Sequence, residues 1–321
     1  MNKLVATAIC ATGLLCAGAK GQKPFVIYRD GKHWIGTWGT APQHFVPGNI
    51  DTFQNQTLRL IVHTSVGGKK VRVEISNTFG DQPLLIGCAR IARRVSKADI
   101  DPAANRALTF GGRASAKVAA RSKVISDPVD LDVPALSDLA ISLFLPEKTM
   151  PTTAHVLAMQ TSYVSGNTGD ATGAVSFPKV SPMASWPFLT GVEVAASPRA
   201  ATIVALGSSL TDGDGSTMDA NGRWPDALAK RLQKAGGLGK ELGVLNEGII
   251  GNRLLSDSDS PRQAGGPASS WSSPCTVGAS PWPVRFGTLR SGRSLATRRQ
   301  VRRRRPRRQR HIVPRLIHTK I

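Results

Sequence analysis

The chain has 321 residues, of which 40% are apolar and 5% aromatic, and its formal net charge is +21. This length gives room for about two domains with substantial cores. The positive charge does not indicate that the whole chain binds nucleic acid, because much of it lies after Asp259. That stretch holds fifteen Lys and Arg residues and no Asp or Glu. Residues 1–259 hold 27 basic and 21 acidic residues, so the excess charge belongs to a tail.

The N-terminal residues 1–19 have the pattern of a signal peptide. Lys3 precedes an apolar run from Leu4 to Cys16, and Ala17-Gly18-Ala19 then supplies small residues for cleavage. The run is shorter than the roughly twenty residues that cross a bilayer. We expect a cleaved signal, a secreted or periplasmic protein and no membrane span after cleavage; an uncleaved anchor is the alternative.

Residues 30–196 have the pattern of a β-sandwich. Apolar and polar residues alternate through residues 57–66 and again through residues 69–79, with Gly67-Gly68 between them, which predicts a β-hairpin. Further short strands are predicted between Pro, Gly, Asp and Asn residues, and many short strands at such spacing favour a sandwich. Their sequences are LLIGCARIA, KVAARSKVI, DLAISLFLP, AHVLAMQTSYV and FLTGVEV.

The pattern changes within residues 199–261, which predict an α/β unit. Residues 201–207 (ATIVALG) form an apolar run that is typical of a strand buried on both faces of a parallel sheet. A helix is predicted next, ending at Gly236-Gly237, and residues 243–251 predict a second strand, which completes a right-handed βαβ unit. The helix places four residues on one face: Trp224, Leu228, Leu232 and Ala235.

Ser209 and Gly251 are the candidate site residues. Both follow the carboxyl ends of the two predicted parallel strands, the edge at which open α/β sheets build their sites. The turn after Gly207 would expose the hydroxyl of Ser209 and aim its backbone N–H at the same point. Gly251 would bring a second N–H close, and both would stabilise an oxyanion. In the other interpretation, Gly-Ser-Ser is an ordinary turn and Ser209 caps the next segment.

The segment GSSLTDGDGS (207–216) resembles the first block of the SGNH or GDSL hydrolases, and NEGIIGNRLL (246–255) resembles the second. WIGTWGTAPQ, TSYVSGNTGDATG and SWPFLTGVEV resemble a secreted bacterial subgroup with a β-sandwich before the hydrolase domain. The resemblance covers residues 30–261. It implies a sandwich followed by part of a three-layer, flavodoxin-like α/β domain. It also implies that Ser209 is the nucleophile and that Ser209 and Gly251 form the oxyanion hole.

The same resemblance implies hydrolysis of small-molecule, carbohydrate or lipid esters without a metal or other cofactor. Two features depart from the family. Ser208 stands where the family has an Asp, and neither the Gly-x-Asn-Asp block nor the Asp-x-x-His block occurs after Gly251. The chain therefore lacks the family's base and third oxyanion donor, and we expect it to have lost most or all activity.

No other residue offers a clear base or metal ligand. Four histidines lie in the β region and two in the basic tail, where no carboxylate orients a ring: His33, His44, His63, His155, His311 and His318. Cys10 and Cys16 would leave with the signal. Cys88 and Cys275 lie far apart in the sequence and predict neither a disulfide framework nor a zinc site.

Residues 262–321 admit three interpretations. They are a basic arm that binds nucleic acid, a disordered extension, or the product of a shifted reading frame, which we favour because the family pattern stops inside a domain. We therefore expect no nucleic-acid partner. The alternative function is a secreted, non-catalytic β-sandwich that binds carbohydrate or a partner protein. The sequence does not indicate the oligomeric state or the particular ester.

Overall fold

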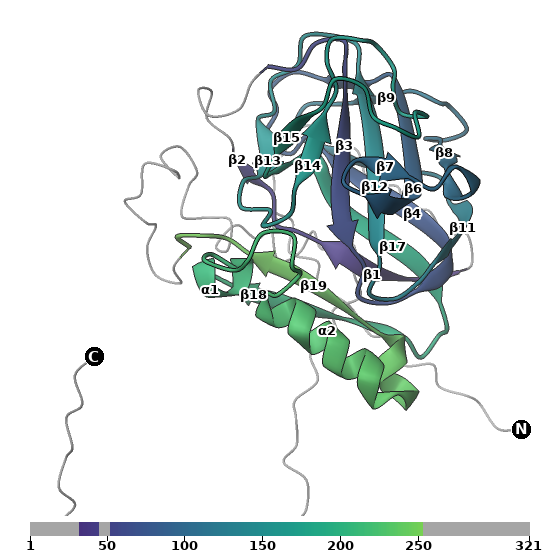
Figure 1. Cartoon of the computed structure of the whole chain (residues 1–321), viewed down its shortest axis with the longest axis vertical. Helices are drawn as coiled ribbons and strands as arrows, with labels where there is room; N and C mark the ends of the chain where they lie inside the picture. The colour runs from purple at the N-terminus through teal and green to yellow at the C-terminus, as the bar shows by residue number, and fades with distance from the viewer. Residues whose placement is uncertain (1–31, 45–51, 253–321) are drawn as a thin grey trace, which may run out of the picture. The chain divides into compact units, whose positions relative to one another are not determined.

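The computed structural model describes residues 32–44 and 52–252, which all belong to one compact unit (Figure 1). Of these residues, 46% are in strands and 11% in helices, so the fold is rich in β-structure. One sheet contains β1 (His33–Gly39), β17 (Leu189–Ala196), β4 (Gly68–Ser76), β10 (Lys123–Ile125) and β11 (Val129–Val133). A second contains β15 (Ser181–Met183), β14 (Ser162–Val164), β3 (Gln56–His63), β12 (Asp138–Leu145), β6 (Cys88–Ser96), β7 (Asp99–Ile100) and β8 (Arg106–Leu108).

Two smaller groups of strands complete the β-structure of residues 32–44 and 52–196. β13 (Thr153–His155) lies between β16 (Trp186–Pro187) and β2 (Gln43–His44), and β5 (Leu84–Ile86) pairs with β9 (Ala116–Val118). A short 3-10 helix spans Pro102–Ala104. The inward residues of β3 and β4 belong to one hydrophobic cluster, so the two large sheets pack face to face: Leu58, Leu60, Val62, Val71, Val73 and Ile75.

The hairpin expected around Gly67-Gly68 is wrong. β3 pairs with β12 and β14, whereas β4 pairs with β17, β10 and β11, so the chain crosses from one sheet to the other at these glycines. The crossing is tight, because a Cβ at Gly67 would lie 2.6 Å from the Val133 carbonyl oxygen. The alternation of apolar residues correctly predicted two strands, although both are buried on both faces over most of their length. It carries no information about which strand pairs with which.

The predicted strand–helix–strand unit is present after the sandwich. β18 (Ala201–Gly207) pairs with β19 (Leu242–Gly248) in parallel and without a register shift, from Ala201 opposite Leu242 to Gly207 opposite Gly248. Between them lie α1 (Ser209–Asp212), α2 (Trp224–Ala235) and a 3-10 helix, Gly237–Glu241. Gly236 ends α2 with a positive φ of 70°.

The three-layer α/β domain expected after the sandwich is wrong. The described residues contribute two parallel strands to this sheet, and α2 packs on β19 while β1 of the sandwich also contacts β19. Figure 1 shows the two strands and α2 next to β1. In a three-layer domain, helices of the same domain would cover the sheet, whereas here β1 of the sandwich packs against β19. The strand–helix–strand unit therefore packs on the sandwich and does not form a separate domain.

Glycines make this attachment possible. A Cβ at Gly243 in β19 would lie 2.0 Å from the carbonyl oxygen of Gly36 in β1, and a Cβ at Gly39 would lie 3.0 Å from Glu247 Oε1. The Thr202 hydroxyl of β18 accepts the Gly36 N–H at 3.0 Å, which fixes the crossing of the strands. Backbones approach this closely only where side chains are absent.

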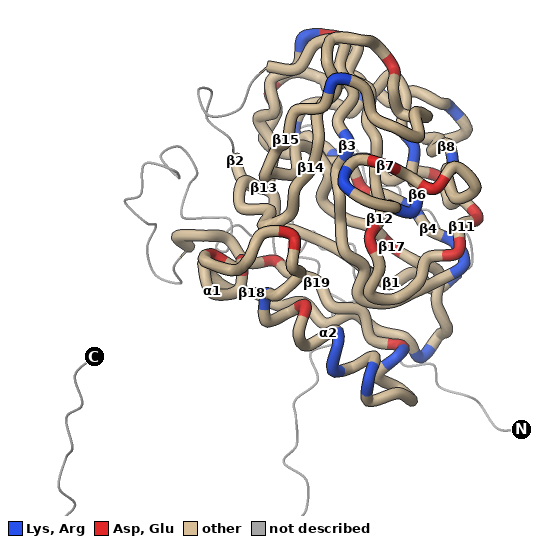
Figure 2. Tube along the Cα trace, viewed as in Figure 1, with Lys and Arg blue, Asp and Glu red and all other residues tan. Residues whose placement is uncertain are grey.

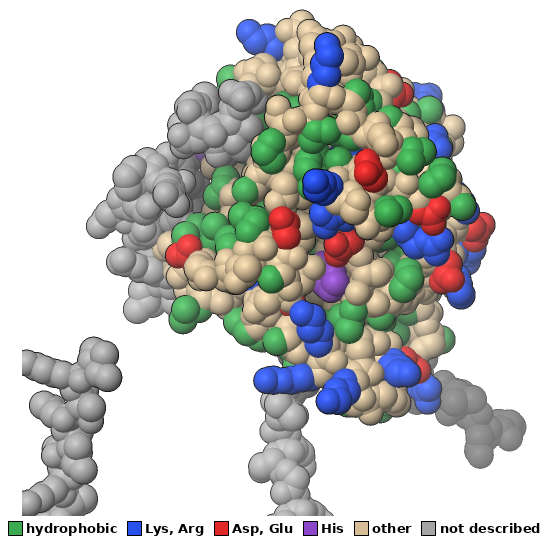
Figure 3. Space-filling view, viewed as in Figure 1, with side chains coloured by type: hydrophobic (Ala, Val, Ile, Leu, Met, Phe, Trp, Pro, Cys, Tyr) green, Lys and Arg blue, Asp and Glu red, His purple; other side chains and the backbone are tan. Residues whose placement is uncertain are grey.

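The unit is less buried than its apolar sequence predicts. β18 was expected to be buried on both faces, yet most of its residues are half-buried and Leu206 is 55% exposed. On α2, Pro225 and Ala229 are buried, whereas Trp224, expected on the inner face, is 46% exposed. Two strands offer only a narrow surface, so the helix buries a narrow stripe. Figure 2 marks Lys and Arg positions along α2, and Figure 3 shows basic side chains on the surface in this region.

Two predicted segments lie outside the described residues. These are the signal peptide, residues 1–19, and the basic tail, residues 262–321. Among the described helices, none has the length and apolar character to cross a membrane.

We predict that Gly243→Ala destabilises the protein, because the new methyl group would meet the Gly36 carbonyl oxygen. The expected loss is about 1–3 kcal/mol of unfolding free energy, the usual cost of overpacking, measured by urea titration with circular dichroism. Gly222→Ala is the control, because a Cβ there has nothing within 4 Å and φ is not positive. Equal stability of the two variants would show that β19 does not depend on this contact.

Candidate functional site

The turn that carries Ser209 forms at the carboxyl end of β18, as the sequence predicted. Ser208 is extended, with φ −99° and ψ −150°, and Ser209 is the first residue of α1. The Ser208 carbonyl accepts the N–H groups of Thr211 at 3.0 Å and Asp212 at 2.9 Å. Gly207 is required here, because a Cβ would lie 1.9 Å from Thr211 Oγ1.

The end of β19 provides the second half of the site. Gly248 lies opposite Gly207, and a Cβ at Gly248 would lie 2.3 Å from the backbone nitrogen of Asp212. The Ile249 N–H continues the strand pairing by donating to the Gly207 carbonyl at 3.0 Å. Gly251 follows in a turn with φ 83°, in the left-handed region that favours glycine. α1 therefore rests directly on the strand that leads to Gly251.

Asp212 joins the two halves. Its side chain is 1% exposed, and its Oδ2 accepts the Ile250 N–H at 2.7 Å, next to Gly251. Its Oδ1 lies 2.9 Å from His155 Nε2 at the end of β13, and its own N–H belongs to the Ser209 turn. One buried carboxylate thus holds the Ser209 turn, the Gly251 loop and the sandwich together.

Further polar contacts fix α1 and the loop after it. Asn246 in β19 donates from Nδ2 to the Thr211 carbonyl at 2.7 Å, and Trp224 donates from Nε1 to Thr211 Oγ1 at 3.2 Å. Arg223 lies over Gly213, whose Cβ would be 2.3 Å from the arginine Cγ, and bonds Asp226 at 3.0 Å. The position of Ser209 is therefore determined by the contacts of neighbouring residues, chiefly Thr211 and Asp212.

The described residues do not give Ser209 a base. Within residues 32–44 and 52–252, the Ser209 hydroxyl makes no hydrogen bond to a histidine or a carboxylate. His33 bonds the Ala200 carbonyl at 2.8 Å, and His63 bonds Asp138 at 2.7 Å. His44 packs against Phe79, and both ring nitrogens of His155 already have partners. His311 and His318 lie outside the described part of the chain.

The motif GSSLTDGDGS contains Asp212 without indicating a role for it, and the sequence does not single out His155 among the six histidines. The two residues are 57 positions apart, and His155 lies on a three-residue strand. No periodicity connects them. Asp212 lies in a predicted turn and His155 in a predicted strand, so no signal in the sequence indicated that the two would pair.

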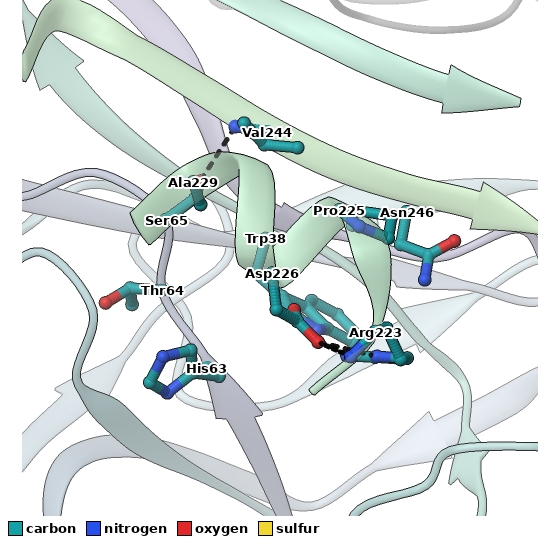
Figure 4. Close-up of a pocket in the computed structure, with 11 residues that line it drawn as sticks. Trp38, His63, Thr64, Ser65, Arg223, Pro225, Asp226, Ala229, Val244 and Asn246 are labelled. Atoms are coloured by element: carbon teal, nitrogen blue, oxygen red, sulfur yellow. Dashed lines mark hydrogen bonds and ion pairs between the residues drawn. The ribbon is translucent and has the colours of Figure 1, made fainter. Parts of the chain in front are cut away.

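A cavity lies between α2 and the ends of β1 and β3, and Figure 4 shows its lining. Its volume is about 20 Å³, enough for about one water molecule. His63 faces it from β3 and stands apart from the Arg223–Asp226 pair of α2. Neither Ser209 nor Gly251 lines this cavity, and it is too small for an ester substrate.

Glu247 is the ionisable residue directly before Gly248, and it lies against Gly39 of β1. Burial raises the pKa of Glu247 to about 7; the charges of His155 and Lys123 oppose this rise, and Glu74 adds to it. The side chain is therefore partly protonated near neutral pH. In the described part of the chain, no cluster of His, Cys, Asp and Glu residues could hold a metal ion.

Comparison with known proteins gives little guidance. No family model matches the chain. No curated protein matches it either. Among solved structures, it is similar to a family two carbohydrate esterase from Clostridium thermocellum in complex with cellohexaose, at 10% identity and a TM-score of 0.19. The match covers 70% of this chain and 54% of the esterase, so the chain spans about half of that structure. A superposition this poor supports no statement about fold or activity.

We predict that Glu247 makes stability depend on pH. Because the folded state raises the pKa of Glu247, its stabilising effect is complete below the ordinary value of 4.5 and is lost as pH rises through about 7. Between about pH 4.5 and about pH 8, the wild type should lose on the order of 1–3 kcal/mol more unfolding free energy than Glu247→Gln.

Urea titrations across this pH range measure the difference. Glu147→Gln is the control, because Glu147 is exposed, and it should keep the wild-type dependence on pH. If Glu247→Gln kept it too, the carboxyl group of Glu247 would not be the source.

Proposed function

We propose that the chain carries the nucleophile half of a serine ester hydrolase related to the SGNH or GDSL family. Ser209 is the nucleophile, and the backbone N–H groups of Ser209 and Gly251 stabilise the oxyanion. One observation carries this proposal. Ser209 and Gly251 follow the carboxyl ends of two paired parallel strands, and the Asp212 carboxylate ties the two segments together.

The proposed chemistry is acyl transfer. The Ser209 oxygen attacks the ester carbonyl carbon as a base removes its proton, and the carbonyl oxygen becomes an oxyanion that accepts the two N–H groups. Collapse of this intermediate releases the alcohol, which takes up a proton, and leaves an acyl-serine. Water then adds to the acyl group and returns the free serine and the carboxylic acid. The substrate class is a small-molecule, carbohydrate or lipid ester, and no cofactor takes part.

The base is the missing component. No histidine among residues 32–44 and 52–252 makes a hydrogen bond to the Ser209 hydroxyl, and each has contacts elsewhere. Loss of triad members removes most of the rate enhancement of a serine hydrolase and leaves only what oxyanion stabilisation and binding supply. We therefore expect the chain to form an acyl-serine readily only when a base is added.

We predict that free imidazole restores acylation. With p-nitrophenyl acetate alone, the wild type should release p-nitrophenol no faster than Ser209→Ala. With added imidazole, the wild type should become acetylated at Ser209 at least about tenfold faster than at any other serine, because the N–H groups of Ser209 and Gly251 are proposed to stabilise the oxyanion there. Peptide mass spectrometry of the full chain locates the acetyl group.

Ser208→Ala is the matched control, because its side chain makes no capping hydrogen bond and it stands next to the nucleophile. It should acetylate at Ser209 like the wild type. Acetyl groups spread evenly over surface serines would refute the assignment of Ser209. Turnover that depends on Ser209 without imidazole would show instead that the chain has a base of its own.

A further inference from the structure

His155 is the residue through which the sandwich contacts the candidate site. It ends β13, the middle strand of the small sheet β16–β13–β2, and its side chain is 2% exposed. Its Nε2 lies 2.9 Å from Asp212 Oδ1, and its Nδ1 lies 2.9 Å from the Ala41 carbonyl oxygen. The Trp186 ring covers it at 5.8 Å between ring centroids. Both ring nitrogens of His155 therefore have partners, and one face of the ring packs against Trp186.

Both partners of the His155 ring are hydrogen-bond acceptors. A carbonyl oxygen can only accept, so Nδ1 carries a proton. Asp212 places one carboxyl oxygen against Nε2, while its other oxygen accepts the Ile250 N–H. A ring protonated at both nitrogens satisfies both acceptors at once, as an imidazolium paired with a carboxylate in the interior.

The electrostatic surroundings agree with this charge state. Burial opposes a charged ring, but the charge of Asp212 and the hydrogen bonds to Asp212 and Ala41 outweigh it, so the pKa of His155 is raised above its ordinary value of 6.5. Arg223 acts in the opposite direction, and Glu247 is the other carboxyl group whose charge interacts with His155.

We propose that His155 is a positioning residue for the Ser209 site, acting through Asp212 on both the Ser209 turn and the Gly251 loop. This inference rests on the proposed function of Ser209. The imidazolium keeps the Asp212 carboxylate charged and fixed in the interior, where an unpaired carboxylate would be very costly. The fixed Asp212 carboxylate then accepts the Ile250 N–H, while the backbone N–H of Asp212 donates to the Ser208 carbonyl. The two oxyanion donors keep their spacing only while this pair is intact.

The pair has a defined dependence on pH. Because folding raises the pKa of His155, the stabilisation is complete below about 6.5 and is lost as pH rises through the higher value of the folded protein. Above that pH the neutral ring can donate from only one nitrogen, so either Ala41 or Asp212 loses its partner. The Ser209 turn and the Gly251 loop should then loosen together.

Hydrogen exchange of the full chain, followed by mass spectrometry, tests this without any substrate. In His155→Gln, peptides covering residues 208–213 and 246–252 should exchange on the order of tenfold faster than in the wild type. The double variant His155→Gln/Asp212→Asn replaces the ion pair by two amides and should recover part of the protection. His44→Gln is the control, because His44 is exposed on β2, the strand that pairs with β13.

Acetylation of Ser209 with added imidazole gives the second measurement. It should slow by a similar factor in His155→Gln and stay unchanged in His44→Gln. If the wild type showed the coupled exchange but no Ser209 acetylation, the proposed function would fail while the coupling stood. If His155→Gln exchanged like His44→Gln, or lost protection evenly over the whole sandwich, the positioning role would be refuted.

A third measurement needs no variant. Nitrogen NMR shifts of the His155 ring report whether each nitrogen is protonated. Both should still be protonated just above about pH 6.5, where an ordinary histidine is already mostly neutral. A neutral ring there would overturn the proposal.

Discussion

The close approach of β19 to β1 is the constraint on which the rest of the site depends. Gly243 contacts the Gly36 carbonyl, and at the other end of the unit Gly248 contacts the backbone of α1. A side chain at Gly243 would move the strand–helix–strand unit away from the sandwich, and one at Gly248 would push β19 away from α1 within the unit. Because the backbones touch, the unit has a fixed place on the sandwich, and short polar side chains can connect the two. This is why Asp212 can be held by a histidine of the sandwich.

A buried carboxylate imposes its own requirement on the structure. Asp212 lies in the interior with the Ile250 N–H on one oxygen and the His155 ring on the other. Removing one partner of such a pair usually costs more than the pair contributes, because the remaining charge is left unpaired. The Ser209 turn and the Gly251 loop therefore depend on β13, which lies far from them in the sequence. The geometry of the candidate site belongs to the sandwich as much as to the unit.

Local sequence patterns predicted the local structure well and the long-range structure poorly. The apolar run at 201–207, the helix ending at Gly236 and the strand beginning near 243 are confirmed, because each depends on periodicity and end signals within a few residues. The predictions of a hairpin at Gly67-Gly68 and of a three-layer domain are wrong. Residues distant in the sequence determine which strands pair and which elements pack on the faces of a sheet. The link between His155 and Asp212 is of the same kind, and one sequence does not contain it as a pattern.

Among the described residues, the hydrogen bonds that shape the Ser209 turn do not involve the Ser209 hydroxyl. Gly207 and Gly248 let α1 lie directly against the two strand ends, and Asp212 fixes the two loops. In a complete serine hydrolase the base interacts with the serine hydroxyl. Loss of the base would therefore remove the group that takes the proton, but none of the contacts that shape this turn. The turn can therefore keep the shape of a nucleophile site in a chain whose described residues provide no base. The packing of a buried charge, and not catalysis, maintains that shape.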